Sequence, residues 1–546
     1  MESNSGRIIA NRVDIPARTI QAVELSWEEG VITSLSVQGG EDASLPYLLP
    51  GFVDAHVHVE SSMLTPAEFA RQAVRHGTLA TVSDPHEIAN VLGVEGVHFM
   101  LENAAQTPFH FLFGAPSCVP ATPFETAGAE LGLEDVEQLL QHPMVGYLSE
   151  MMNFPGVLAD DPQVMAKIQA ARRLGLPVDG HAPGLVGEQA QRYAAAGIST
   201  DHECFSLEEA KEKIAAGMHI LIREGSAARN FAALHPLISL HPQQVMLCSD
   251  DKHPDDLVDG HINRLVARAV AEGHDLFDVL GCACINPLRH YALRLGQLNL
   301  GESMDGILVN DLKGFAAKAC WLKGEIVAED GRSLLPHLKV TPINRFKAKP
   351  IDGNALRIVA SGEQVRVIEA LDGELVTHEL FEPPLVVDGI AEPDTGRDML
   401  LLAVVNRYQP AQPALAFIRN FGLREGAIAS SVAHDSHNIV AVGADRQSLA
   451  AAINAVIETH GGISVVDSQG MERLPLPVAG IMSDREGEWV AERYAALDQR
   501  AKALGCSLRA PFMTLSFMAL LVIPELKLSD RGLFDGRSFD FVSIWK

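Results

Sequence analysis

The sequence predicts an α/β fold built around a closed (β/α)8 barrel of the TIM type. Short apolar runs alternate eight times with helix-length segments, and side chains that can bind metals stand where several of these runs end. Eight strands, each followed by a helix, within about 250 residues is the composition of such a barrel, whose active site lies at the C-terminal ends of the strands. The alternative is an open doubly wound sheet, but no Gly-rich phosphate-binding turn occurs in this region.

The apolar runs give the eight strands of the predicted barrel in chain order. They cover residues 48–59, 79–85, 109–117, 144–150, 176–183, 197–203, 218–225 and 245–251. Ala-rich amphipathic segments separate most neighbours, for example PQVMAKIQAARRLG before the fifth strand and LVGEQAQRYAAAG before the sixth. The barrel is therefore expected to occupy residues 49–297.

The two flanks of the barrel show different patterns. Residues 1–48 contain short strands with a tight turn at Glu29-Gly30, and strand character returns in residues 298–339. Residues 340–546 mix strand and helix signals and are expected to form a C-terminal α+β domain. A chain of 546 residues has the length of two to four domains.

The first barrel strand carries His56 and His58. Residues two apart on a strand share a face, so these two imidazoles can bind one metal ion. A bare His-x-His pair is more often two histidines on the exposed half of a strand, but Asp54 precedes the pair and Glu60 follows it. Other potential ligands end four further strands: Glu150, His181, His202, Asp250 and Asp251.

Composition restricts the class of protein and the partners. The formal net charge of -27 repels phosphate backbones, so polymeric nucleic acid is not expected as a partner, and a small substrate fits better. No apolar run approaches the ~18 residues that cross a bilayer, and no secretory signal is recognised, so we expect a cytoplasmic protein. Seven scattered cysteines without a Cys-x-x-Cys pair predict reduced thiols.

The strand-end residues resemble the amidohydrolase superfamily. Its pattern is His-x-His on the first barrel strand, a carboxylate or modified lysine on the fourth, single histidines on the fifth and sixth, and aspartate on the eighth. Longer strings are similar to the bacterial adenine deaminase branch: PGFVDAHVHVESSM, VSDPHEIANVLG, SEMMNFPGV, DGHAPGL, TDHE, REGSAARN, CSDDKHP and, beyond the barrel, SVAHDSHNIVAVG. The resemblance is thus nearly full-length.

This resemblance implies a centre of two divalent cations. It makes His56, His58 and Asp250 ligands of one ion, His181 and His202 ligands of the other, and Glu150 the bridge, where many relatives have a carbamylated lysine. Nitrogen and oxygen donors suit Mn(II), Fe(II) or Zn(II), and the family's adenine deaminases favour manganese or iron. It also implies that the strands flanking the barrel pair into one small composite β-sandwich.

The implied reaction is the deamination of adenine, as in purine salvage. Metal binding lowers the pKa of water from about 15.7 to about 7 and supplies a hydroxide, which attacks C6 of adenine to give hypoxanthine and ammonia. A carboxylate must carry the proton to the departing amino group. Asp250 is the first choice, and its rivals are Asp251, Glu87, Glu203 and Glu224. The His-x-Glu and Pro-Cys-x-x-Cys signature of the other zinc deaminases is missing.

Substrate contacts are predicted from polar residues near the strand ends. Arg223 and Glu224 can hydrogen-bond a purine edge, or can form an ion pair that fixes their loop. His86 and Glu87 end the second strand and either contact the base, support the ligands or have a purely structural role; Asp251 and His434 complete the predicted set. The motif HDSHN at residues 434–438 is either a further metal site or a hydrogen-bonded turn that lines the barrel mouth.

Two other functions stay open for the sequence. Another amidohydrolase could share this metal core and act on a different aminopurine or a cyclic amide, because the core does not encode the substrate. A non-catalytic scaffold is the second alternative, although such members typically lose ligands and every expected position is filled here. The C-terminal domain is expected to restrict access to a small base and to contribute to a homo-oligomer interface.

Overall fold

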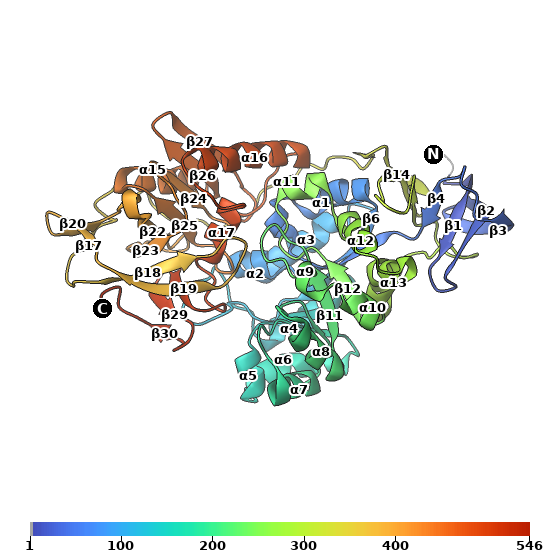
Figure 1. Cartoon of the computed structure of the whole chain (residues 1–546), viewed down its shortest axis with the longest axis horizontal. Coiled ribbons are helices and arrows are strands. Elements are labelled where there is room, and N and C mark those ends of the chain that lie inside the picture. The colour runs from blue at the N-terminus through green and yellow to red at the C-terminus, as the bar shows by residue number, and fades with distance from the viewer. Residues whose placement is uncertain (1–3) are drawn as a thin grey trace.

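The barrel predicted from the sequence is confirmed in the computed structural model, which describes residues 4–546 (Figure 1). Its strands are parallel and follow the chain: β5 (Phe52–Val57), β6 (Thr78–Ser83), β7 (His110–Ala115), β8 (Val145–Met151), β9 (Val178–Gly180), β10 (Thr200–Asp201), β11 (His219–Arg223) and β12 (Val245–Cys248). Each lies within one of the eight apolar runs, except that β6 begins one residue earlier and β8 ends one residue later, because parallel strands buried on both faces are continuously apolar.

Backbone hydrogen bonds close the strands into a barrel. The Ser199 amide donates to the Val178 carbonyl at 2.9 Å and joins β9 to the segment that leads into β10. The Asp250 amide donates to the His56 carbonyl at 2.9 Å, and the His58 amide donates to the Asp250 carbonyl at 3.3 Å, which joins the last strand to the first. An open doubly wound sheet has free edges at these places, so that alternative is excluded.

Helices follow the strands around the barrel. They are α1 (Pro66–Ala73), α2 (His86–Leu92), α3 (Val94–Ala104), α4 (Leu133–Leu139), α5 (Phe154–Leu158), α6 (Pro162–Arg173), α7 (Gly187–Ala195), α8 (Leu207–Ala215), α9 (Phe231–Leu234), α10 (Leu237–Leu240), α11 (Pro254–Asp259), α12 (Ile262–Ala271), α13 (Leu276–Leu280) and α14 (Asn286–His290). The small residues and spaced apolar positions seen in the sequence form the faces that pack on the barrel.

Asp161 begins helix α6 in the manner of an N-cap. Its carboxylate accepts from the amides of Gln163 at 2.9 Å and Val164 at 3.1 Å. We expect Asp161→Ala to lower the free energy of unfolding, measured by urea denaturation, by about 1 kcal/mol. The neighbouring Asp160→Asn is the matched control. Asparagine tolerates the left-handed backbone of Asp160 (φ 54°), and loss of the exposed ion pair with Arg192 should change stability by less than about 0.5 kcal/mol. Equal losses would contradict the capping role.

The two flanks of the barrel share one eight-stranded sheet. Its order is β16-β15-β14-β13-β4-β1-β2-β3. The strands that follow the barrel thus form one half of the sheet, the strands that precede it form the other half, and β13 pairs with β4 where the halves meet. The strands are β1 (Gly6–Asp14), β2 (Thr19–Glu28), β3 (Val31–Gly40), β4 (Tyr47–Leu49), β13 (Gly306–Val309), β14 (Ala317–Leu322), β15 (Glu325–Glu329) and β16 (Arg332–Ser333). Trp27 and Trp321 meet edge to face with ring centroids 6.3 Å apart, so both flanks contribute to one core.

The C-terminal part adds a second mixed sheet, seen on the opposite side of the barrel from the N-terminal strands (Figure 1). Its strands, in spatial order, are β19 (Thr377–Glu382), β18 (Val365–Ala370), β23 (Ala414–Arg419), β22 (Leu400–Val405), β25 (Ile439–Gly443), β24 (Ala427–Ser430), β26 (Gly462–Asp467) and β27 (Gly470–Pro475). Two small sheets accompany it: β17 (Ile358–Val359) with β20 (Leu385–Val387) and β21 (Ile390–Glu392), and β28 (Leu526–Ser529) with β29 (Gly532–Asp535) and β30 (Asp540–Phe541).

Three helices complete the C-terminal part. They are α15 (Arg446–Glu458), α16 (Gly487–Ala503) and α17 (Pro511–Phe517). Helix α15 packs on β24, β25 and β26, while α16 contacts α11 of the barrel. Within residues 4–546, helices of the length and apolarity that a bilayer crossing requires are not found. The seven cysteines are buried and unpaired, as the sequence predicts.

Candidate metal centre

Six donor side chains meet at the C-terminal end of the barrel. They are His56, His58, Glu150, His181, His202 and Asp250, each inside a strand or within two residues of its end. His56 and His58 share a face because successive side chains of a strand alternate. Asp250 adopts a left-handed backbone conformation with φ 54°, which aspartate tolerates better than most residues.

The two carboxylates lie between the histidines. Asp250 Oδ1 is 3.6 Å from His56 Nε2 and 3.4 Å from His58 Nε2. Glu150 Oε1 is 3.6 Å from His58 Nε2, whereas Glu150 Oε2 is 2.9 Å from His181 Nδ1 and 3.0 Å from His202 Nε2. The two oxygens of Glu150 therefore face two different groups of histidines, which is the arrangement that a bridging ligand requires.

These donors fit divalent metal ions. All six side chains are buried, and both ring nitrogens of His56 and Nε2 of His181 have no hydrogen-bond partner. A buried polar atom without a partner is costly, and metal binding satisfies it. Donor atoms of His56, His58 and Asp250 lie within 4.8 Å of one another, and so do those of His56, Glu150 and His202. Imidazole and carboxylate donors suit Mn, Fe or Zn.

Mutual charge sets the protonation of the cluster. Burial alone would raise the pKa of Glu150, but His181 and His202 lower this pKa well below its ordinary value. Burial opposes the protonation of His202, yet the hydrogen bond to Glu150 and the nearby carboxylates raise the pKa of His202 to about 9. Burial lowers the pKa of His56 to about 3. At neutral pH the centre therefore presents an ionised bridge and a neutral His56, whereas His202 has to release a proton when it binds a metal ion.

Arg223 fixes Asp250 through the carboxylate oxygen that does not face His56 and His58. The side chain of Arg223 is buried and donates to Asp250 Oδ2 at 2.6 Å, while it also forms a bidentate pair with Glu203. Burial would raise the pKa of Asp250, but the guanidinium of Arg223 lowers this pKa well below its ordinary value. Arg223 also lines the cavity of the centre, so its predicted contact with a purine edge stays a prediction beside these ion pairs.

Asp54, the residue before the His-x-His pair, fixes the seam of the barrel. It accepts from the Ser249 amide at 2.9 Å, from the Ser249 hydroxyl and from His261 Nε2 at 2.8 Å. These bonds tie the first strand to the last at the level of the centre. Asp54 is thus a positioning residue for His56 and Asp250.

The second strand end and the C-terminal part meet over the centre. Glu87 accepts hydrogen bonds from both His434 Nδ1 and His437 Nε2. His86 lies between the metal centre and the HDSHN motif, with its Nδ1 3.5 Å from Glu150 Oε1 and its Nε2 3.5 Å from Asp435 Oδ1. The HDSHN motif thus makes hydrogen bonds at the barrel mouth, as one of the two predictions has it. Donor atoms of His86, Glu87 and Asp435 also lie within 4.8 Å of one another, so the further metal site stays a prediction beside it.

Asp251 and Glu224 differ in placement, although both were predicted to contact substrate. Asp251 lines the cavity of the centre, where its Oδ1 accepts from the Ser61 hydroxyl at 2.5 Å and lies 3.7 Å from His434 Nε2. Glu224 points elsewhere and pairs with Arg268 at 3.1 Å. Glu224 directly follows Arg223 at the strand end, so its side chain turns to the other face of the sheet. Its predicted contact with substrate has no basis in this geometry.

Sequence reasoning missed several residues of this cavity. Asp84 supports His86, with Asp84 Oδ2 3.3 Å from His86 Nδ1, and its place at the end of the second strand is a signal that was available. The remaining missed residues line the cavity from other parts of the chain: Met152, Leu375, Asp435, Phe517 and Leu520. Asp435 lies in the recognised HDSHN motif and Met152 in the string SEMMNFPGV, but Leu375, Phe517 and Leu520 lie in none of the recognised strings.

Lys527 holds the C-terminal wall of the cavity. Its ammonium is buried and donates to the carbonyls of Leu375 at 2.6 Å and Phe517 at 3.0 Å. Burial lowers the pKa of Lys527 to about 7, against about 10.4 for an unfolded lysine. The unfolded chain therefore binds more protons than the folded chain between these values, and this group makes stability rise with pH.

We expect Lys527→Met to remove that pH dependence. The free energy of unfolding of the variant minus that of the wild type should be about 2 kcal/mol higher at pH 7.0 than at pH 8.5, since one pKa unit is worth about 1.4 kcal/mol. Urea denaturation at both pH values measures the difference. Lys318→Met, which removes an exposed lysine, should give the same difference from wild type at both pH values. A pH-independent effect of Lys527→Met would contradict a lowered pKa.

Comparison with known proteins places this geometry in a family. Residues 47–327 match the model of the amidohydrolase family, and residues 374–540 match the adenine deaminase C-terminal domain. The adenine deaminases of Salinibacter ruber, Sulfurovum sp. and Methanosarcina mazei are 55%, 52% and 49% identical to this chain, with 98% of each chain covered. Amidohydrolases use divalent metal ions, in keeping with the donor clusters. From its barrel, its donors and these relatives, the chain belongs to the adenine deaminase family of amidohydrolases.

Proposed function

We propose that this protein is an adenine deaminase, which hydrolyses adenine to hypoxanthine and ammonia. The observation that supports this most directly is the position of Glu150, whose two oxygens face separate groups of histidines in a buried barrel end. The relatives that are named adenine deaminase match over nearly the whole chain, including the C-terminal part that lines the cavity.

The proposed cofactor is a pair of divalent ions, Mn(II) or Fe(II), with Zn(II) as the alternative. His56, His58 and Asp250 would hold one ion, His181 and His202 the other, and Glu150 both. When bound, such ions lower the pKa of water to about 7 and so supply a nucleophile at neutral pH. The chain's own residues then have to orient the base, exclude bulk water and move one proton.

Asp250 is the proposed proton carrier. One of its oxygens faces His56 and His58, and the other accepts from Arg223, so the carboxylate is fixed and ionised before reaction. It can take the proton of the attacking water and deliver it to the amino group that leaves C6. Asp251 is the next candidate, because it lies beside Asp250 and lines the same cavity.

The purine would be held by the polar groups over the centre. His86, Glu87, Asp251 and His434 line the cavity together with Asp435, and they offer both donors and acceptors to the ring nitrogens. Phe517 stacks on His434 with ring centroids 5.1 Å apart, and with other apolar side chains it covers the cavity. Exclusion of water strengthens each of these polar interactions.

The alternative is an amidohydrolase for a different aminopurine or a cyclic amide, since the metal core does not encode the substrate. Ammonia release from adenine by the Mn(II)-reconstituted protein distinguishes the two, with adenosine, guanine and cytosine assayed alongside and metal content measured in the same sample. We expect turnover of adenine alone. Two bound metal ions without adenine turnover would overturn the substrate. Light scattering on this sample tests the proposed homo-oligomer.

A further inference from the structure

The cavity of the metal centre shares a wall with a second, larger cavity. The inner cavity measures about 30 Å³ and the outer about 430 Å³, and Met152 lines both. An inner space of this size holds about one or two water molecules, whereas pockets for small molecules typically measure ~300–1,000 Å³. The outer cavity therefore has the size of a ligand site, and the inner one does not.

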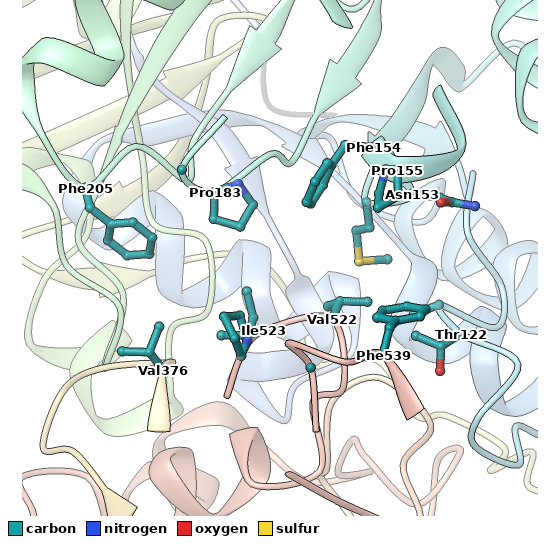
Figure 2. Close-up of a pocket in the computed structure, with 15 residues that line it drawn as sticks. Thr122, Asn153, Phe154, Pro155, Pro183, Phe205, Val376, Val522, Ile523 and Phe539 are labelled. Carbon is teal, nitrogen blue, oxygen red and sulfur yellow. The ribbon is translucent and has the colours of Figure 1, made fainter. Parts of the chain in front are cut away.

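The outer cavity lies between the barrel loops and the C-terminal part (Figure 2). Phe154 faces it from the start of α5, and Pro183 and Phe205 face it from the loops after β9 and β10. Val376 and Phe539 face it from the C-terminal side. Its mouth thus opens where the two parts of the chain meet. A molecule in this cavity lies directly outside the wall of the metal centre.

Three adjacent features make up the wall between the cavities. Leu375 lines the inner cavity and its neighbour Val376 the outer, as expected for successive residues with opposite directions. Leu520 lines the inner cavity and Val522, in the turn that follows, lines the outer one, while Met152 lines both. A fused two-ring base is larger than the inner space, so it must displace part of this wall to enter. The flexible thioether chain of Met152 is suited to such movement.

The lining of the outer cavity selects a class of ligand. None of its fifteen lining residues is charged, and three of them are phenylalanines. Phosphate recognition relies on cationic side chains or aligned donors, so the lining offers nothing to a nucleotide's phosphate. Aromatic rings stack on flat heterocycles. The cavity therefore fits an uncharged, planar, nitrogen-containing ring system.

Phe539 is held at the mouth in an unusual conformation. Its backbone φ is 55° and its side chain is 46% exposed, both uncommon for a bulky apolar residue. Phe124 and Phe534 support the ring, each with centroids 5.4 Å away. A residue in a disfavoured conformation is often kept for function, and here the turn between β29 and β30 presents an aromatic face to the cavity. Phe205, which is 43% exposed, is presented from the barrel side.

We propose that the outer cavity binds the free purine base before it passes Met152 to the metal centre. This inference rests on the proposed deamination of a purine base, and it adds a binding site and a route to that function. Phe154, Phe205 and Phe539 supply stacking surfaces, and Met152 with Leu375 and Leu520 forms the passage. The missing cationic lining makes the site selective for the free base over nucleotides.

The first test fills or strips the outer cavity without touching the metal donors. Ala121→Phe, which places a ring in the cavity, should lower kcat/KM for adenine about tenfold, with kcat within about twofold and metal content unchanged. Phe539→Ala should lower kcat/KM about fivefold through lost stacking. This variant tests the same cavity if Ala121→Phe folds poorly. Phe541→Ala is the matched control, because Phe541 also packs on Phe124 and Phe534 but does not line the cavity. Unchanged kcat/KM in both cavity variants would overturn the route.

The second test measures binding without turnover. Phe205→Trp places a fluorophore at the mouth, and unsubstituted purine, which has no amino group to lose, serves as the probe. We expect purine to quench the tryptophan fluorescence of this variant saturably and more strongly than that of the wild type. The dissociation constant of purine should rise about tenfold when Ala121→Phe is added. No saturable signal, or one that Ala121→Phe leaves unaltered, would overturn the site even in an active deaminase. Quenching by a protein that fails to deaminate adenine would refute the proposed function and leave the site standing.

Discussion

Glu150→Ala is expected to lose the paired metal site and nearly all deaminase activity. The two oxygens of Glu150 face both groups of histidines, at 3.6 Å from His58 and at 2.9 Å and 3.0 Å from His181 and His202. Without it, two cations would lie close together with less negative charge between them, and His181 and His202 would lose a carboxylate partner. We expect bound metal to fall from two equivalents to one or fewer.

The activity loss follows from the lost centre. We expect kcat/KM for adenine to fall by at least about 10³-fold, which corresponds to about 4 kcal/mol of transition-state stabilisation. Metal analysis of the reconstituted protein and the ammonia assay measure the two effects. Glu224→Ala removes another glutamate at a strand end, but one that pairs with Arg268 away from the centre, and it should retain both metals and activity. A Glu150→Ala protein with two tightly bound ions and normal turnover would refute the bridging role.

Arg223→Met is expected to give the largest loss of stability among the variants considered. The buried guanidinium neutralises Asp250 and Glu203 together. Removal of one member of a buried ionic network leaves uncompensated charge and typically costs ~3–5 kcal/mol. Because Asp250 also faces the histidines, we expect the loss to be larger in metal-depleted protein than in protein loaded with Mn(II). Urea denaturation of both forms provides the comparison.

The same variant should also impair catalysis. With Arg223 gone, Asp250 loses the group that fixes its orientation and lowers its pKa, and the loss of such a supporting partner typically costs ~10–100-fold in metal affinity or activity. Arg268→Met is the control, because its ion pair with Glu224 is partly exposed and worth less than about 1 kcal/mol. If the two variants have the same stability in the metal-depleted state, the buried ion network is not a major source of stability.

The sequence predicted the barrel well because each strand carries its own signal. A parallel strand that is buried on both faces is an apolar run, and the helices between the runs are amphipathic. The donors were found for a related reason: the C-terminal ends of all eight strands meet at one end of the barrel. Residues such as His56, Glu150 and Asp250, far apart in the chain, are therefore brought together by the fold class alone. Their roles as ligands stay predictions.

Contacts between the barrel and the C-terminal part could not be predicted in this way. Glu87 binds His434 and His437, which lie about 350 positions later in the chain, and no periodicity in the sequence records such a pairing. The same holds for Lys527, which ties together the segments of Leu375 and Phe517. Packing of two separately folded units decides these contacts, so they become visible only in the tertiary structure.

By itself, the sequence predicted the fold class, which depends on local patterns and on the shared direction of parallel strands. Its resemblance to known proteins predicted the family and the set of six donors. The tertiary structure decided which face each neighbouring side chain takes and what covers the centre. Arg223 points to Asp250 whereas Glu224 points away, and Leu375 and Val376 divide two cavities in the same manner. The physical reason is that successive residues of an extended chain point in opposite directions. A shift of one position therefore decides whether a side chain faces the centre or points away from it. Only packing against distant segments fixes this register.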